Sequence, residues 1–198
     1  MPDKLFLASH SPRRRELIRL LGVNCDMLDP PDIDEASFVK TFTGNVIDML
    51  AALAKAKAEL VLPSLREGYL VCADTDVIHE GEILGKPSGP EDAFRMLKRL
   101  SGDWHIVITG VAVAKAPEGA ILTNAACTQV KFAPMGDADI RRYVASGEPL
   151  DKAGAYGIQG LAAPFIECIN GCYFNVVGLP LSLLRNLLLE AGFRFDGV

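Results

Sequence analysis

Three consecutive arginines stand where a helix is expected to begin. Ser11 has a side chain preferred at the N-cap, and Pro12 suits the first helical position, where an N–H has no intrahelical partner. Arg13–Arg15 then fall in the first turn, where the helix dipole already carries partial positive charge. Free N–H groups, this dipole and guanidinium groups together favour a phosphate ligand. The alternative is a run of solvated arginines beside Glu16, because salt screening weakens the repulsion between these cations and the helix dipole.

Acidic residues follow a second apolar run. Tyr69–Ala73 is predicted to be a buried strand that ends at Asp74, Thr75 and Asp76. The carboxyl end of such a strand is the usual place for an active-site carboxylate in α/β proteins. If the strand continues, Asp74 and Asp76 share a face and can hold Mg²⁺, or one of them can act as general base for a water. A turn cap on an exposed loop is the alternative.

The segment Gly81–Ser88 has a superficial likeness to a P-loop. It is one residue short between the glycines, and Pro87 stands where a magnesium-binding Ser or Thr is required, so a Walker site is excluded. Lys86, between a glycine and a proline, is a candidate phosphate-binding cation. An ordinary surface lysine is the alternative.

A glycine-rich stretch covers Asp151–Gly160. Its glycines permit close approach of the backbone to a ligand, and Tyr156 can stack on a base. The amide of Gln159 offers both a donor and an acceptor, which match a uracil or thymine edge. The edge of adenine can be matched by this amide as well, so Gln159 does not decide which base is bound. A purely structural loop is the alternative.

Composition limits the classes of partner. The chain has 198 residues and a net charge of −5, which argues against broad binding to nucleic acid or to a membrane surface. Any anion site must therefore be a local positive pocket. The sequence shows no apolar run of membrane-spanning length and no signal-peptide pattern, so we expect a cytoplasmic protein.

The cysteines and histidines predict no metal centre. The five cysteines are scattered without a C-x-x-C pair, which favours reduced thiols, although Cys168 and Cys172 flank an Asn-Gly turn signal and can face each other across two strands. The three histidines lie far apart in the sequence. A histidine-based metal site is therefore not expected.

The elements that carry these residues alternate between strand and helix early, with hairpins later. This pattern predicts a mixed α/β sheet flanked by helices. An acidic loop is expected at Asp29–Glu35, and Lys55 and Lys57 are placed on the polar face of their helix. The predicted strands are Leu5–Ala8, Cys25–Leu28, Tyr69–Ala73, Trp104–Lys115, Ala120–Phe132, Phe165–Ile169 and Tyr173–Val177, and the predicted helices are Pro12–Leu21, Val46–Leu62, Pro90–Leu100, Ala138–Ala145 and Leu181–Ala191.

Taken in order, the motifs resemble the Maf family of nucleoside triphosphate pyrophosphatases. The resemblance spans nearly the whole chain, and it implies one Maf-like domain over residues 1–198, with an elongated mixed sheet and two lobes around a central cleft, similar to the inosine triphosphate pyrophosphatases. The matching segments are Leu7–Arg14, Asp32–Glu35, Ala54–Ala56, Ala73–Thr75, Gly85–Pro87, Asp151–Gly160 and Asn175–Pro180.

The resemblance also implies chemistry, namely hydrolysis of a nucleoside triphosphate to the monophosphate and pyrophosphate. It carries the general base to Asp74 and matches Glu35 to the family's acidic active-site residue. With this reading we expect a divalent cation, Mg²⁺ or Mn²⁺, at Glu35 and Asp74. The implied phosphate-binding residues are Ser11, Arg13, Arg14, Lys55 and Lys86, and those implied in base choice are Arg13, Thr75 and Gln159.

The tyrosine-bearing Gly154–Gly160 segment looks like the dTTP/UTP subfamily rather than the subfamily acting on 7-methyl-GTP. A homodimer is the family-level expectation. The competing function is a nucleotide-binding regulator of septum formation that acts through protein contacts. Asp76 departs from the apolar residue usual in the family, and Arg15 has no family role.

Overall fold

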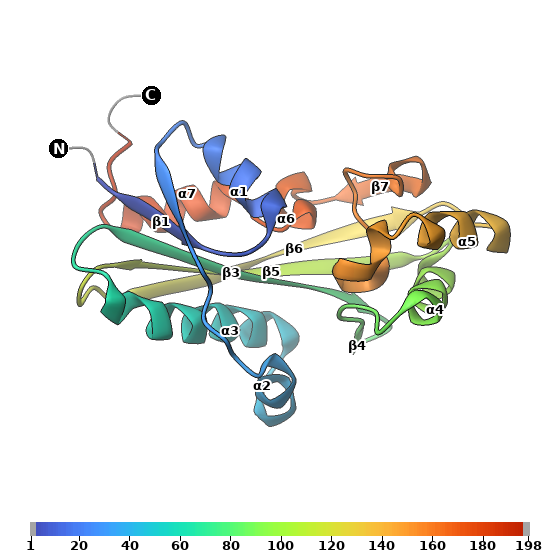
Figure 1. Ribbon diagram of the computed structural model, residues 1–198, viewed down its shortest axis with the longest axis horizontal. Coiled ribbons are helices and arrows are strands. Elements are labelled where there is room, and N and C mark those ends of the chain that lie inside the picture. Colours follow the sequence, from blue (N-terminus) through green and yellow to red (C-terminus); the bar gives the residue numbers. More distant parts are fainter. Residues whose placement is uncertain (1–2, 196–198) are drawn as a thin grey trace. The chain divides into compact units, whose positions relative to one another are not determined.

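The structure is a computed structural model that describes residues 3–195 (Figure 1). The chain forms two compact units. The first comprises the chain up to Asp74, Thr109–Ala126 and the part from Gly178 onward, and the second comprises Thr75–Ile108 and Cys127–Val177. Candidate residues occur in both units, and the expectation of a single two-lobed domain stays a prediction.

The described residues contain a seven-stranded mixed sheet with the order β2-β1-β3-β5-β6-β7, and β4 pairs with β3. β1 is parallel to β2 and to β3, whereas β4 is antiparallel to β3 and β7 is antiparallel to β6. The mixed α/β sheet flanked by helices is thus confirmed. The strands are β1 (Leu5–Ala8), β2 (Cys25–Leu28), β3 (Tyr69–His79), β4 (Glu82–Ile83), β5 (Trp104–Lys115), β6 (Ile121–Phe132) and β7 (Ile166–Asn170).

Helices cover both faces of the sheet in the first unit. α1 and α7 lie on one face and α3 lies on the other (Figure 1). The expected N-cap is confirmed, because the Ser11 side chain accepts the backbone N–H of Arg14. The helices of this unit are α1 (Pro12–Arg19), α2 (Glu35–Thr41), α3 (Val46–Val61) and α7 (Leu181–Glu190), and a 3₁₀ turn, η1 (Leu62–Ser64), follows α3.

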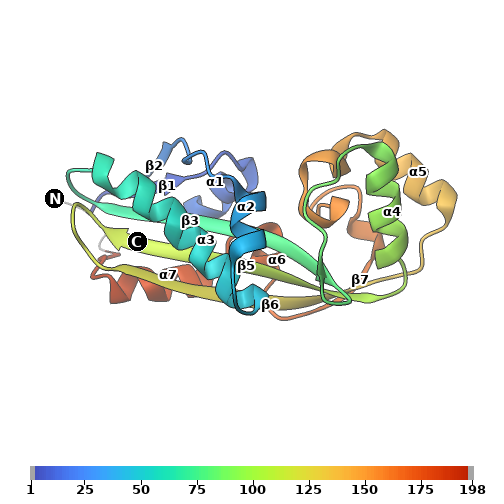
Figure 2. The same ribbon diagram turned by 90° about the horizontal axis from the view of Figure 1, so that it is seen from below.

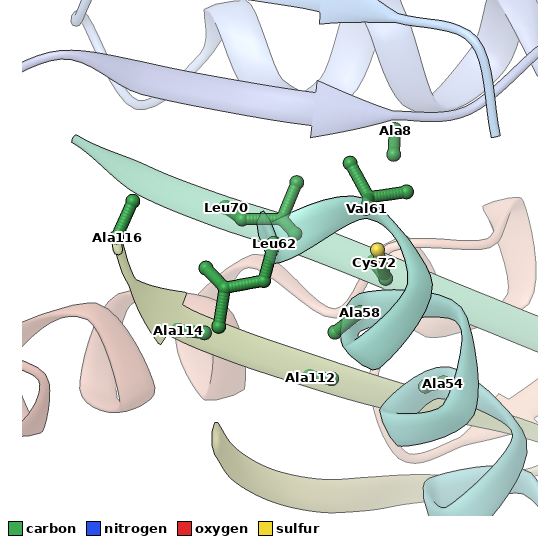
Figure 3. Packing of buried hydrophobic residues seen from close by; sticks show 10 residues of the cluster. All are labelled: Ala8, Ala54, Ala58, Val61, Leu62, Leu70, Cys72, Ala112, Ala114 and Ala116. Atoms are coloured by element: carbon green, nitrogen blue, oxygen red, sulfur yellow. The ribbon is translucent and has the colours of Figure 1, made fainter. Parts of the chain in front are cut away.

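Small residues bring α3 close to the sheet. Ala54 and Ala58 of α3 pack in one buried cluster with Ala112 and Ala114 of β5 (Figure 3). The approach is closest at Gly110, where an added Cβ would lie 2.1 Å from the carbonyl oxygen of Leu50. The backbone of α3 therefore rests directly on β5.

In the second unit, α4 (Pro90–Leu100) and α5 (Asp137–Ala145) lie side by side (Figure 2). An aromatic cluster is buried in this unit: the rings of His105, Phe132 and Tyr156 meet edge to face. The remaining elements are the 3₁₀ turns η2 (Glu148–Asp151), η3 (Ala153–Ala155) and η4 (Ala163–Phe165), and the short helix α6 (Tyr173–Val177).

The predicted strand at Tyr173–Val177 is wrong, because this segment is α6. Long-range hydrogen bonds fix the helical turn: Asn175 Nδ2 donates to the carbonyl oxygen of Val107 and to Thr128 Oγ1. Cys168 and Cys172 consequently do not face each other across a hairpin, and both thiols are free. Tertiary hydrogen bonding thus overrides the β-propensity of this segment.

Two further elements differ from expectation. β3 does not end at Asp74 but continues to His79, so Asp74 is a strand residue rather than a turn cap. The acidic loop expected at Asp29–Glu35 ends one residue earlier, because α2 begins at Glu35. The Asp34 side chain caps this helix by accepting the N–H of Ser37. Among the described residues, no helix has both the length and the apolar character required to cross a membrane.

Candidate active site

A buried lysine joins two carboxylates in the first unit. Lys57 Nζ donates to Asp74 Oδ1 at 2.5 Å and to Glu35 Oε1 at 2.7 Å. The Lys57 side chain is 10% exposed and that of Asp74 13%, whereas that of Glu35 is 54% exposed. Strand β3, helix α3 and the first turn of α2 thus each contribute one charged group to a single cluster.

The electrostatics of this cluster keep the lysine charged. Burial by itself would lower the pKa of Lys57, but the charge of Asp74 and the hydrogen bonds to Asp74 and Glu35 outweigh it and raise the pKa above its ordinary value. The ammonium group in turn fixes the orientation of both carboxylates. The arrangement offers an oriented proton acceptor and hard oxygen ligands beside a fixed positive charge.

Arg14 holds the backbone next to this cluster. Its Nε donates to the carbonyl oxygen of Gly178 and its Nη1 to that of Ala73, both at 2.8 Å. Burial lowers the pKa of Arg14, and the negative charge of Asp74 only partly offsets this effect. A guanidinium group nevertheless stays protonated at neutral pH. Arg14 therefore places a positive charge near Asp74 while it anchors the residue that precedes it.

The other two arginines have different surroundings. Both Nε and Nη2 of Arg15 donate to the carbonyl oxygen of Ser9, at 3.1 and 3.0 Å, so Arg15 holds the chain at the end of β1. Arg13 is half-buried, and its guanidinium group makes no hydrogen bond or ion pair with any residue in the range 3–195. Of the three, Arg13 is the one whose donors are available to a ligand.

Lys57 was missed from sequence, although its signal is present. The structure leaves Lys55 half exposed and 3.6 Å from Glu59, and does not bring it to the carboxylates. The placement of Lys57 on the polar face of the helix is wrong. Lys57 lies on the buried face of α3, at the spacing of Leu50, Leu53 and Val61.

Lys86 and the glycine-rich stretch are tied together in the second unit. The carbonyl oxygen of Gly85 accepts the N–H of Gly154 at 2.8 Å. Lys86 follows Gly85 and is exposed, and Thr75 is half-buried at the start of this unit's part of β3. The backbone contact holds the Lys86 segment beside the glycine-rich loop.

Tyr156 cannot stack on a base in this structure. The residue is 6% exposed, and its hydroxyl lies 2.8 Å from His105 Nε2. Burial raises the pKa of Tyr156, so the hydroxyl stays protonated. The expectation of a stacking tyrosine is wrong because the aromatic core takes up the ring. Gln159, in contrast, is exposed.

The ordered motifs agree with comparisons to known proteins. The family model described as "Maf-like protein" matches residues 4–191. The chain belongs to the Maf family. The Maf chain is 43% identical over 190 residues to the dTTP/UTP pyrophosphatase of Carboxydothermus hydrogenoformans, covering 96% of this chain and 100% of the relative. It is 45% identical over 191 residues to the dTTP/UTP pyrophosphatase of Clostridium botulinum (strain Alaska E43 / Type E3), covering 95% and 99%.

The fold of this Maf protein also resembles a solved structure. A HAM1 protein from Coxiella burnetii matches with a TM-score of 0.53 and 18% identity, covering 96% of this chain and 100% of that chain. At this identity the likeness concerns the fold alone. It agrees with the mixed α/β sheet described above.

Proposed function

We propose that this Maf protein hydrolyses dTTP and UTP to the monophosphate and pyrophosphate. The observation that carries the proposal is the Asp74–Lys57–Glu35 cluster, in a chain 43% identical over almost its whole length to a relative named dTTP/UTP pyrophosphatase. A general base, a charged lysine and an arginine beside it are the groups that phosphoryl-type hydrolysis requires.

Asp74 is the proposed general base. It takes a proton from a water molecule, whose oxygen attacks the α-phosphorus. The bond between the α-phosphorus and the bridging oxygen to the β-phosphorus breaks, and pyrophosphate leaves with the bonding electrons. Lys57 holds the Asp74 carboxylate through Oδ1 and so limits its rotation. An oriented base avoids the entropic cost of finding the reactive geometry during the reaction.

The phosphate groups require cations, and we propose that Arg13 supplies direct hydrogen bonds while Arg14 contributes mainly its charge. This division follows from the two backbone carbonyl groups that Arg14 already binds. Lys57 takes the role that the family motif gave to Lys55. Ser11, whose hydroxyl caps α1, and the exposed Lys86 complete the proposed set. Positive groups offset the charge that develops on the leaving pyrophosphate.

Glu35 and Asp74 are the residues that would hold Mg²⁺ or Mn²⁺. The described residues include no group of three or more potential metal ligands. Two carboxylates nevertheless suit Mg²⁺, which keeps several waters and takes further oxygens from substrate phosphates. When bound, the ion would neutralise phosphate charge. Pyrophosphate release that persists undiminished in excess EDTA would contradict this assignment.

For base choice we propose Arg13, Thr75 and Gln159, supported by the available donors of Arg13 and by the exposure of Gln159. We also propose that the protein acts as a homodimer in the cytoplasm. Light scattering on the purified chain tests the first part of this statement, and fractionation of cells tests the second.

A substrate panel tests the proposed function. Wild-type protein and Asp74→Asn are incubated with dTTP, UTP, CTP, GTP and 7-methyl-GTP plus Mg²⁺ or Mn²⁺, and pyrophosphate and orthophosphate are both measured. We expect pyrophosphate from dTTP and UTP, and a loss of about 1000-fold in kcat in the variant, because asparagine cannot accept the proton. An unchanged thermal unfolding midpoint is the control for folding.

Three outcomes of this panel would contradict the proposal. Orthophosphate as the product would move cleavage to the γ-phosphate, and preference for 7-methyl-GTP would refute the subfamily. Nucleotide binding without turnover would favour the regulator that acts through protein contacts.

A further inference from the structure

The glycine-rich loop is held by a phenol and a carboxylate that belong to none of the motifs assigned above. Tyr143 lies on α5 and Glu148 begins η2. The Tyr143 hydroxyl donates to Glu148 Oε1 at 2.8 Å and accepts the backbone N–H of Gly157 at 3.1 Å. Glu148 Oε2 accepts the N–H of Leu161 at 3.0 Å. One side-chain pair thus fixes both ends of the five-residue segment Gly157–Leu161.

The packing leaves this segment little room to move. A Cβ added to Gly160 would lie 2.2 Å from Glu148 Oε1, and one added to Gly157 would lie 2.8 Å from Lys152 Cε. Lys152 Nζ donates to the carbonyl oxygen of Glu148 at 2.6 Å, and its side chain is 12% exposed. Real Cβ atoms do not approach other atoms so closely, so a side chain at either glycine would push the Glu148 carboxylate or the Lys152 side chain out of the position described above.

The protonation state of the phenol supports the direction of the hydrogen bond. Tyr143 is 3% exposed, and burial raises its pKa above the ordinary value. The hydroxyl therefore keeps its proton at physiological pH and donates it to Glu148 while it accepts from Gly157. A hydrogen bond to a charged acceptor is stronger than one between neutral groups.

Gln159 lies in the middle of the segment and is exposed, between the buried Ile158 and the half-buried Gly160. We propose that Tyr143 and Glu148 are positioning residues for base selectivity, which act by fixing the backbone that presents the Gln159 amide. The inference rests on the proposed function, because it concerns how the proposed pyrophosphatase distinguishes one nucleotide base from another. An amide discriminates between base edges only when its donor and acceptor are held in place.

The test combines Tyr143→Phe with Gln159→Ala. The phenylalanine keeps the ring and removes both hydrogen bonds of the hydroxyl, and Tyr173→Phe, at an exposed tyrosine on α6, is the matched control. We expect Tyr143→Phe to lower the ratio of kcat/KM for dTTP over CTP by about tenfold, mostly through KM for dTTP, and Gln159→Ala to do the same. The double variant should show no further loss, because both changes remove one function.

A merely structural role gives a different result. If Tyr143→Phe lowers kcat/KM equally for all nucleotides, or if the two substitutions add in the double variant, the positioning role is overturned. Amide hydrogen exchange at Gly157 and Leu161 should speed up in Tyr143→Phe and not in Tyr173→Phe. Should Tyr143→Phe fail to fold, Glu148→Gln is measured in the same way.

The failures of the two proposals are distinguishable. Absence of pyrophosphate release by the wild-type protein overturns the proposed function. Unchanged selectivity in an active Tyr143→Phe overturns only the positioning role.

Discussion

Lys55 and Lys57 lie two residues apart on α3 and have opposite surroundings. Residues at this spacing do not share a helix face, so one ammonium group can pair with Glu59 at the surface while the other is buried between Asp74 and Glu35. Removing one partner of a buried ion pair is costly because the remaining charge is left without compensation. We therefore propose that Lys57, rather than Lys55, is the lysine of α3 that takes part in the chemistry.

We predict that Lys57→Met and Lys55→Met have very different effects. Lys57→Met should lower kcat for dTTP at least 100-fold, corresponding to about 3 kcal/mol of lost transition-state stabilisation. The substitution removes both the group that orients Asp74 and a cation close to the phosphates. Lys55→Met should stay within about threefold of wild type, as expected for an exposed ion pair. Steady-state pyrophosphate release measures both. Equal losses in the two variants would refute the assignment.

At the scale of elements, the approach of α3 to β5 decides where Lys57 lies. The alanines of the shared cluster and Gly110 let the helix backbone rest on the sheet, and Lys57 neighbours Ala58 of that cluster. Larger side chains at this interface would lift the helix and carry the ammonium group away from Asp74. The packing of α3 on β5 therefore sets where Lys57 lies relative to Asp74.

We predict that Gly110→Ala destabilises the fold by about 3 kcal/mol, because its Cβ would overlap the Leu50 carbonyl group and the close-packed interface cannot yield freely. Urea denaturation measures the free energy of unfolding. Gly89→Ala is the matched control, since an added Cβ there meets no atom within 4 Å and the backbone is extended. A Gly110→Ala protein as stable as the Gly89→Ala protein would contradict the close contact.

At the scale of the whole molecule, acid stability depends on a buried histidine in the second unit. Burial, with a smaller effect of His79, lowers the pKa of His105 to about 4. Between the ordinary pKa of 6.5 and this value the unfolded chain binds a proton that the folded chain does not. Stability contributed by neutral His105 is thus complete above pH 6.5 and is lost as the pH falls toward 4.

We predict that the free energy of unfolding of the wild-type protein falls by about 3 kcal/mol between pH 7 and pH 4 on account of His105, because the unfolded chain gains about 1.4 kcal/mol for each pH unit between 6.5 and about 4. His105→Gln, which keeps a hydrogen-bonding group for Tyr156, should show a smaller fall. Urea denaturation across this range measures the difference. Parallel pH profiles for the two proteins would contradict the prediction, since carboxylates such as Asp92 titrate in both.

The sequence predicted the elements whose signals are local. The N-cap at Ser11, the long strand Trp104–Lys115 and the helix Pro90–Leu100 follow from capping chemistry and periodicity within one segment, and all are confirmed. The ordered motifs indicated the Maf family for the same reason, since each is a short run of residues. An active-site carboxylate at Asp74 or Asp76 was indicated by the apolar strand before them, and the resemblance to the Maf family assigned the general base to Asp74.

Only the tertiary structure decided which side chains are buried together. It buried Lys57 between Asp74 and Glu35 and left Lys55 at the surface. It also placed Tyr156 in an aromatic core and made Tyr173–Val177 a helix, with a hydrogen bond from Asn175 to Val107, 68 residues away. Burial and pairing between distant residues determine these outcomes, and a local pattern does not encode them. The sequence by itself determined the family and the kinds of chemical group, and the fold determined which of those groups meet.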